Sequence, residues 1–279
     1  MRPFKTGTLV VALVCTLGVA GMLAHDFWLI PNAFSVAPGS DVIVLGRTSS
    51  TFPTTLSAVT PDRIAHARLL LESDAEDITS LSVQSNSLRL ERKAPRVGQA
   101  LVVAAILPRS VPESPESFRQ YLRLEGAPEA LARYEREGLL PTTDIVRRYA
   151  KYAKTLIQIG RDGPRAFGRE AGHPLEFVPL SDPAAVGAGG SLRFRVQLFG
   201  RPLAGARGHA SVATSAASDR AHHEATFESD AKGEFTVALA SAGLWNVRAL
   251  YILPAPSGSG ADWDVHWATF VWGIGGPDN

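Results

Sequence analysis

The sequence predicts a mainly β protein: two β-sandwich modules, immunoglobulin-like or carboxypeptidase-regulatory-like, with a helical insertion. Three observations predict this fold. Apolar and polar residues alternate with a period of two over much of the chain, which is typical of half-buried strands. One internal stretch, residues 117–154, changes to a helical period. A segment rich in Gly, Pro and charged residues, 161–173, then separates two β-rich halves.

The first half, residues 25–116, is predicted to form an N-terminal β-sandwich of about seven strands. Alternating strands are indicated by FSVAPGSDVIVLGR, ARLLLES and SLRLERK. The segment QALVVAAILP is apolar without interruption, which favours a central strand buried on both faces.

Residues 117–160 are predicted to form a helical insertion and a returning strand. A loop is expected before it, because PRSVPESPES (108–117) holds three prolines. One helix begins at Pro128 and ends at Gly138. A second is expected in TTDIVRRYAKYAK, with Thr142 or Thr143 as N-cap and its apolar residues on one face. TLIQIG then returns to strand.

Residues 161–173 are interpreted as a linker, and residues 174–279 as a C-terminal β-sandwich. SDAKGEF indicates a hairpin turn in which Gly233 takes positive φ. GRPLAGA is similar to the strand and turn that open immunoglobulin-like and carboxypeptidase-regulatory-like sandwiches. The final strand is DWDVHWATFVWG, in which Asp264, His266 and Ala268 share one face.

Residues 1–24 are predicted to be a secretory signal peptide. Arg2 and Lys5 precede a long apolar run, and Ala24 suits the last position before cleavage. The run is shorter than the roughly 20 residues of a spanning helix, which argues against an uncleaved anchor. The only cysteine, Cys15, lies inside this leader, so the mature chain has neither disulfide nor thiolate ligand. We therefore expect a periplasmic or secreted protein.

Composition and motifs exclude several functional classes. The 28 basic and 27 acidic residues balance and form no basic stripe, which argues against a nucleic-acid partner. No second stretch is long and apolar enough to span a membrane. HExxH, GxSxG, P-loop and GxGxxG motifs do not occur in a useful context, so we expect no enzyme.

His25 is the strongest candidate for chemistry. If cleavage follows Ala24, the free α-amine and the imidazole of His25 chelate Cu(II) or Ni(II) in one ring. A second imidazole has to lie within about 4 Å, because each metal–nitrogen bond is about 2 Å long. Asp26 would add an oxygen ligand or orient the amine. The alternative is that His25 simply precedes the first strand.

His266 is the best candidate for the second imidazole, and Asp264 on the same strand face would ligate the metal or orient that imidazole. The alternative for this pair is an exposed strand face. His66 and His173 are interpreted as structural, and His222 and His223 as part of a solvated loop. For His209 both interpretations stay open.

The tryptophans offer a different function. Trp245, Trp263, Trp267 and Trp272 would form a sugar-binding platform if they were exposed and coplanar. In a β-sandwich such residues belong more often to the core. A hydrolase would instead need a cleft with two carboxylates about 5–10 Å apart.

An ordered set of segments resembles a bacterial exported family of mostly unknown function, grouped with periplasmic and substrate-specific components of nickel-uptake systems. The resemblance rests on AHDFWLIP, RRYAKYAKTLIQIG, GHPLEFVPLSDP, GRPLAGA, DAKGEF, GLWNVRALY and ADWDVHWATFVW. It implies a β-rich periplasmic protein that handles a transition metal. The family pattern has histidine at the place of Tyr251 and tyrosine at the place of His266. If these positions pair across a hairpin, an imidazole stays in the same place; if not, a family metal site is broken here.

The leading prediction is thus a periplasmic protein that binds and delivers a transition metal, nickel first and copper or cobalt next. The predicted ligands are His25 and His266, with Asp26 and Asp264 as oxygen ligands or supports. A membrane metal-uptake transporter is the expected partner. The alternative is a metal-free β-sandwich module that recognises a carbohydrate, a peptide or a surface partner.

Overall fold

The computed structural model describes residues 25–125, 128–213 and 223–275. The predicted signal peptide, its cleavage site, Cys15 and His222 lie outside these residues. The described chain is mainly β, with two α-helices, which confirms the predicted fold class.

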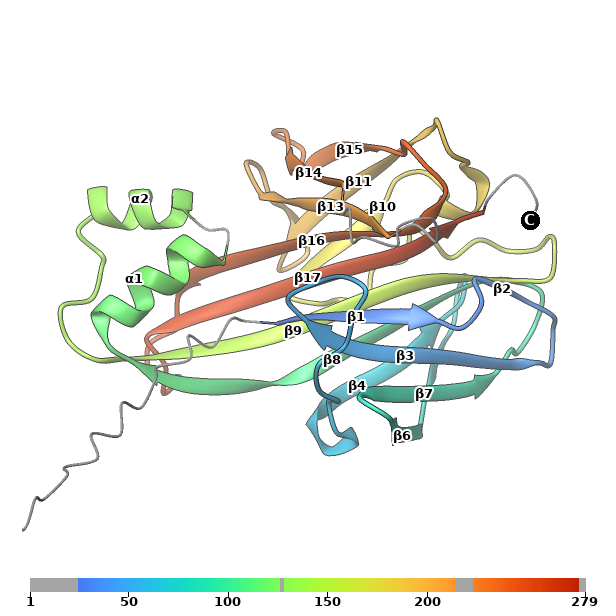
Figure 1. The fold of residues 1–279 in the computed structure, drawn as a ribbon, viewed down its shortest axis with the longest axis horizontal. Coiled ribbons are helices and arrows are strands. Elements are labelled where there is room, and N and C mark those ends of the chain that lie inside the picture. Colours follow the sequence, from blue (N-terminus) through green and yellow to red (C-terminus); the bar gives the residue numbers. More distant parts are fainter. Residues whose placement is uncertain (1–24, 126–127, 214–222, 276–279) are drawn as a thin grey trace, which may run out of the picture.

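A long central sheet forms the middle layer of the molecule (Figure 1). Its strand order is β14-β13-β16-β17-β9-β8-β4-β5, and β2 pairs with the end of β9. The strands are β2 (Ser35–Val36), β4 (Ile64–Leu70), β5 (Ala75–Asp77), β8 (Gly98–Glu113), β9 (Ile145–Ile159), β13 (Arg207–Ala213), β14 (His223–Glu228), β16 (Gly243–Pro254) and β17 (Trp263–Ile274).

A small sheet covers each face of the central sheet, so the two sandwiches share one middle layer. On one face lies the sheet of β1 (Asp26–Pro31), β3 (Asp41–Ser49), β7 (Ser87–Lys93) and β6 (Ser80–Gln84). On the other lies the sheet of β10 (Leu175–Pro179), β11 (Ser191–Leu198), β12 (Arg201–Pro202) and β15 (Glu234–Ala238). We call these the amino-terminal face and the carboxy-terminal face of the central sheet.

The two halves of the chain join directly in the central sheet, because β17 pairs in parallel with β9. The segment 161–173, interpreted from the sequence as a linker, has two residues buried beneath the surface, Ala166 and His173. It therefore packs against the sandwich rather than spanning solvent between the halves.

The predicted second helix is wrong, because TTDIVRRYAKYAK belongs largely to strand β9. Its apolar residues fit a helical period because Arg147 and Lys154 are buried in ion pairs with Glu113 and Glu176, which breaks the alternation of apolar and polar residues. The loop predicted over 108–117 is also wrong in its first part, because β8 continues to Glu113. A register shift between Ile106 and Arg109 accommodates Pro108 in that strand.

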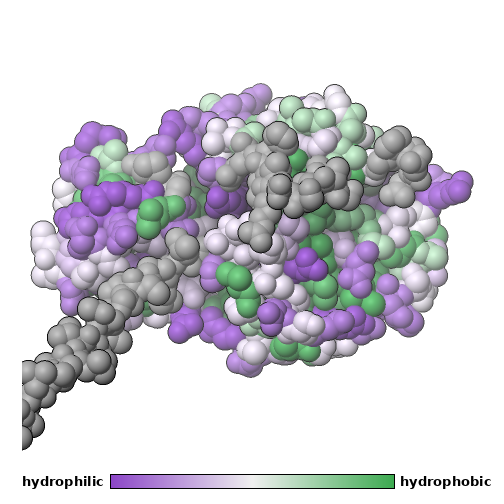
Figure 2. Space-filling model, in the orientation of Figure 1, coloured by the Kyte–Doolittle hydropathy of each residue, from purple (hydrophilic) through white to green (hydrophobic). Residues whose placement is uncertain are grey.

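The helical insertion consists of α1 (Pro115–Leu124) and α2 (Pro128–Arg136), and the helix predicted from Pro128 is confirmed. Gly138 follows with φ of +67°, as a C-terminal glycine does. The helices pack on the ends of β16 and β17, and the surface around them is mainly hydrophilic (Figure 2). Two short 3₁₀ turns, Pro61–Arg63 and Pro183–Ala185, complete the elements. None of the helices among the described residues is long and apolar enough to cross a membrane.

The turn predicted at Gly233 is present, with φ of +72°, but it does not close a hairpin. The strand before it, β14, pairs with β13 in the central sheet, whereas β15 pairs with β11 in the small sheet. The turn therefore carries the chain from one layer to the other.

Candidate metal site

His66 and His173 meet on the carboxy-terminal face, although 107 residues separate them in the sequence. Their Nε2 atoms are 2.9 Å apart. Both side chains were interpreted as structural from the sequence. The two imidazoles are in direct contact, with ring centroids 5.1 Å apart.

His66 is placed by the register of the central sheet. His66 lies opposite Ala105 on β8, and Ala105 lies opposite Tyr152 on β9. Tyr152 in turn lies opposite Ala268 on β17. Paired residues point to the same side of a sheet, so His66 and Tyr152 share the carboxy-terminal face. Ala105, which lies between them, is buried and short, and this leaves room for a side chain that arrives from above the sheet.

His173 arrives from the segment that crosses this face, and a buried ion pair fixes that segment. Lys154 Nζ lies 2.8 Å from Glu176 Oε2, and both side chains are about 1% exposed. The same carboxylate accepts hydrogen bonds from the backbone N–H groups of Ala171 (2.9 Å) and Gly172 (3.2 Å). Glu176 therefore holds the backbone immediately before His173.

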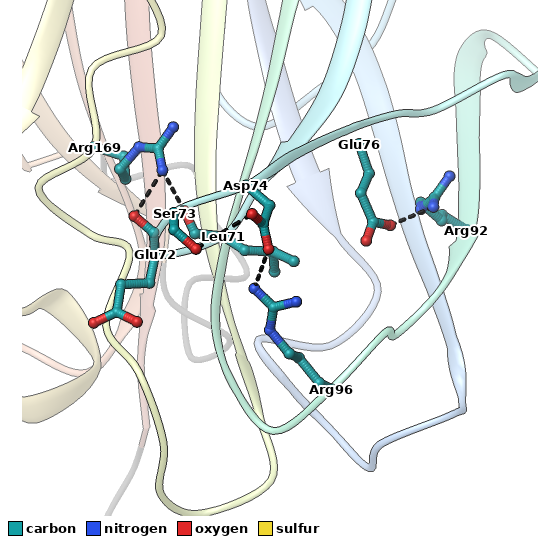
Figure 3. A network of polar contacts seen from close by, with 8 residues as sticks. All are labelled: Leu71, Glu72, Ser73, Asp74, Glu76, Arg92, Arg96 and Arg169. Atoms are coloured by element: carbon teal, nitrogen blue, oxygen red, sulfur yellow. Dashed lines mark hydrogen bonds and ion pairs between the residues drawn. The ribbon is translucent and has the colours of Figure 1, made fainter.

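Arg169 fastens the same segment to the end of β4. Its Nη1 donates to the backbone carbonyls of Leu71 (2.8 Å) and Glu72 (2.7 Å), in the turn that follows β4 (Figure 3). That turn is itself braced by an ion pair of 2.6 Å between Arg96 and Asp74. Because His66 lies on β4, these contacts set the position of His173 relative to His66.

Both imidazoles are held in the neutral form. Burial lowers the pKa of His173 to about 2, and the nearby charges of Lys154 and Arg68 act in the same direction. Burial also lowers the pKa of His66, with a further contribution from Arg68. Neutral imidazole is the form that ligates metals. The Nδ1 atom of His173 is buried and makes no hydrogen bond, so no contact among the described residues fixes its tautomer.

A row of stacked rings leads from this pair to His266. The ring of Tyr152 stacks on His173, with centroids 5.1 Å apart, and on His266, with centroids 5.9 Å apart. Its hydroxyl lies 3.1 Å from His266 Nδ1. Phe199 also contacts His266, edge-on, with ring centroids 5.4 Å apart. The Nε2 atom of His266 is buried without a hydrogen bond.

The structure does not bring His25 and His266 together, because they lie on opposite sides of the central sheet. His266 shares the carboxy-terminal face with Tyr152. The carbonyl of His25 accepts a hydrogen bond from Lys151, which lies opposite Trp267 and so points to the amino-terminal face. Thr269 Oγ1, on that same face, donates to the carbonyl of Phe27 (2.6 Å).

The two predicted aspartate ligands are engaged by arginines. Asp26 is about 3% exposed, and its Oδ2 lies 3.5 Å from Arg248. Asp264 accepts two hydrogen bonds from Arg148, of 2.7 and 2.8 Å. The imidazole of His266 contacts Tyr152 through Nδ1 rather than Asp264. Near His25, burial and the charge of Lys151 lower the pKa of the His25 imidazole.

Other predicted features can be placed as well. Tyr251 lies directly opposite His266 in the β16–β17 pair. The two positions therefore pair across a hairpin, as an exchange of histidine and tyrosine relative to the family pattern requires. All five tryptophans are buried, so they form no exposed platform for a sugar; these are Trp28, Trp245, Trp263, Trp267 and Trp272. His209 lies on β13 and is partly buried.

The sequence profile of a domain of unknown function, DUF4198, matches residues 22–253. The chain belongs to this family. His25, His66 and His173 lie inside the matched region, and His266 lies beyond it. A search of curated proteins found no match to this chain.

Among solved structures, the full ectodomain of mouse nectin-like molecule 4, with domains Ig1–Ig3, is similar to this DUF4198 protein at 10% sequence identity and a TM-score of 0.19. The match covers 92% of this chain and 66% of the ectodomain, so the chain spans slightly less than two thirds of that length.

Proposed function

We propose that this DUF4198 protein binds a divalent transition-metal ion through the Nε2 atoms of His66 and His173 and delivers it outside the cytoplasm. The observation that carries the proposal is the 2.9 Å separation of two neutral, buried or half-buried imidazole nitrogens. Nickel is the first candidate ion, with copper or cobalt next. A membrane metal-uptake transporter in the same envelope is the proposed recipient, in line with the resemblance to nickel-uptake components.

The separation of the two nitrogens can be compared with the geometry of metal ligands. With metal–nitrogen bonds of about 2.0–2.1 Å, neighbouring ligands at 90° lie about 2.9 Å apart, whereas tetrahedral ligands lie about 3.3 Å apart. Right-angled ligand positions belong to square-planar, tetragonal and octahedral ions such as Ni(II) and Cu(II). The observed 2.9 Å equals the right-angled separation, and it is also the length of an ordinary hydrogen bond between the two rings, so the choice among Ni(II), Cu(II) and Zn(II) is left to the titration.

Without metal, the same two nitrogens share one hydrogen bond, which requires opposite tautomers. Metal binding requires both rings to carry their proton on Nδ1 instead. Since the Nδ1 atom of His173 has no hydrogen-bond partner among the described residues, neither tautomer of this ring is stabilised there.

The test is calorimetric titration of the metal-free protein with Ni(II), Cu(II) and Zn(II). We expect one equivalent of Ni(II) or Cu(II) to bind, and His66→Ala and His173→Ala to weaken that binding at least about 100-fold, or about 2.7 kcal/mol. His209→Ala is the matched control and should leave the affinity unchanged. Because His173 is buried, circular dichroism has to show that His173→Ala folds; half-buried His66 provides the cleaner variant.

His25→Ala separates this proposal from the amino-terminal chelate. If His25→Ala abolishes binding while His66→Ala does not, the metal site lies at the amino terminus and the present proposal is wrong. Intact mass of the exported protein shows in the same sample whether the chain begins at His25.

A further inference from the structure

Two imidazoles leave most of a metal's coordination sphere unfilled. Structural and catalytic sites in proteins supply three or four ligands to a tetrahedral ion, and octahedral ions take six. Among the described residues, no group of three or more His, Cys, Asp or Glu side chains is placed to hold an ion together. Side chains of these four types among the described residues therefore do not complete the coordination sphere, and water or a bound molecule would supply further ligands.

An open groove beside His66 offers space for such ligands. It has a volume of about 710 Å³ and runs along the outer edge of β4, where β5 pairs only with residues from Arg68 to Leu70. Its lining includes His66, Arg68 and Asp77. A volume of this size lies within the range of about 300–1,000 Å³ that is usual for small-molecule sites.

The charge next to His66 selects the class of ligand. Arg68 lies two residues along the same strand, about 7 Å away along its axis, and points to the same face. Its side chain is 40% exposed, and its nearest carboxylate, that of Asp77, is 3.9 Å away and itself 77% exposed. Such a pair is weak, so the guanidinium retains capacity for a second carboxylate. The other cation near the imidazoles, Lys154, is already paired with Glu176.

From this arrangement we infer that the ion is bound as a complex with a small carboxylate chelator, in which His66 and His173 ligate the metal and Arg68 binds a carboxylate of the chelator. This inference rests on the proposed metal site and specifies its cargo. A hydrated cation beside Arg68 meets repulsion, whereas a chelate that carries carboxylates meets a complementary charge and brings the ligands that the protein lacks.

The experiment measures whether the chelator itself is retained. Metal-free protein is dialysed against radiolabelled citrate, with and without one equivalent of Ni(II). We expect citrate to be retained only with Ni(II), in a 1:1:1 ratio, and to be lost in His66→Ala. Arg68→Ala should weaken retention about tenfold while Ni(II) alone still binds, and Arg68→Lys should recover part of it. Arg89→Ala, on β7 of the small sheet that covers the amino-terminal face, is the matched control.

The outcomes separate the two proposals. If citrate removes Ni(II) from the protein and is not itself retained, or if Arg68→Ala retains citrate as the unmodified protein does, the chelate inference is wrong while the two-histidine site stands. If Ni(II) alone does not bind to the unmodified protein, and no citrate is retained with it, the proposed function fails as well.

Discussion

The two faces of the central sheet bury polar groups in different ways. On the amino-terminal face, charged groups are matched by partners: Asp26 lies beside Arg248, Arg147 pairs with Glu113, and Lys151 donates to the carbonyl of His25. On the carboxy-terminal face, one matched pair, Lys154 with Glu176, lies beside neutral imidazoles, and nitrogens of His173 and His266 lack hydrogen bonds. The carboxy-terminal face thus adds a contact between two neutral imidazoles, and the Nε2 atoms that meet in it are the proposed metal ligands.

The difference also shows how each face is built. The amino-terminal face receives β1 from the beginning of the chain, and Thr269 and Lys151 bind its backbone carbonyls. The carboxy-terminal face receives the segment before β10, which is held by Glu176 and Arg169 rather than by strand pairing. The site histidine His173 thus depends on a few side chains, which makes it sensitive to substitution.

The largest expected effect comes from the ion pair that holds this segment. Glu176→Gln leaves Lys154 charged, buried and unpaired, so we expect a loss of about 3–5 kcal/mol in the free energy of unfolding. Urea unfolding measures it. Asp41→Asn, in the exposed pair with Lys93 on the other small sheet, should cost less than about 1 kcal/mol. Equal losses of unfolding free energy in the two variants would contradict the claim that the buried Lys154–Glu176 pair holds the segment more strongly than a surface pair holds its strands.

The pH dependence of stability should differ between the faces. The folded-state pKa of His173 is about 2, so below its ordinary value of 6.5 the unfolded chain binds a proton that the folded chain does not. The stability is complete above pH 6.5 and falls by about 1.4 kcal/mol per pH unit below it. Chemical unfolding of metal-free protein between pH 7 and pH 5 should therefore show a shallower decline for His173→Gln than for the unmodified protein. His25→Gln, at a more exposed histidine, should change the slope less; the opposite order would contradict the account.

The smallest expected effect concerns Phe199, which covers His266. Its φ is +51°, a left-handed conformation that favours glycine, and its side chain is 58% exposed. Phe199→Gly should relieve backbone strain of about 1 kcal/mol and offset the lost contact with His266, so that stability changes little. Modification of histidine by diethyl pyrocarbonate should then become faster at His266, as read by peptide mass. An unchanged rate at His266 would show that Phe199 does not shield it.

The sequence predicts the β elements of this fold well and its polar contacts poorly. Alternation identifies β4 and β7, and β17 is recognised with its two faces correctly assigned although both faces are buried. Strand β9 is missed because Arg147 and Lys154 are buried in ion pairs, so its polar residues do not mark an exposed face. The pairing of Tyr251 with His266 follows from a simple hairpin, which local sequence can indicate.

The candidate site depends on a long-range contact that no local pattern contains. His66 and His173 come together through strand pairing across β4, β8 and β9 and through the packing of residues 161–173. The sequence carries one signal: His66 and Arg68 are two residues apart along β4, so both side chains point to the same side of the strand. Predicting that this side faces a second histidine would have required the order of the strands in the sheet.

The most direct measurement is anomalous diffraction at the nickel edge from crystals of the protein grown with Ni(II) and citrate. We predict one strong peak, about 2 Å from the Nε2 atoms of both His66 and His173, with density for a carboxylate ligand between the peak and Arg68. A peak at His25 on the amino-terminal face, with none between His66 and His173, would contradict the assignment of metal binding to the carboxy-terminal face.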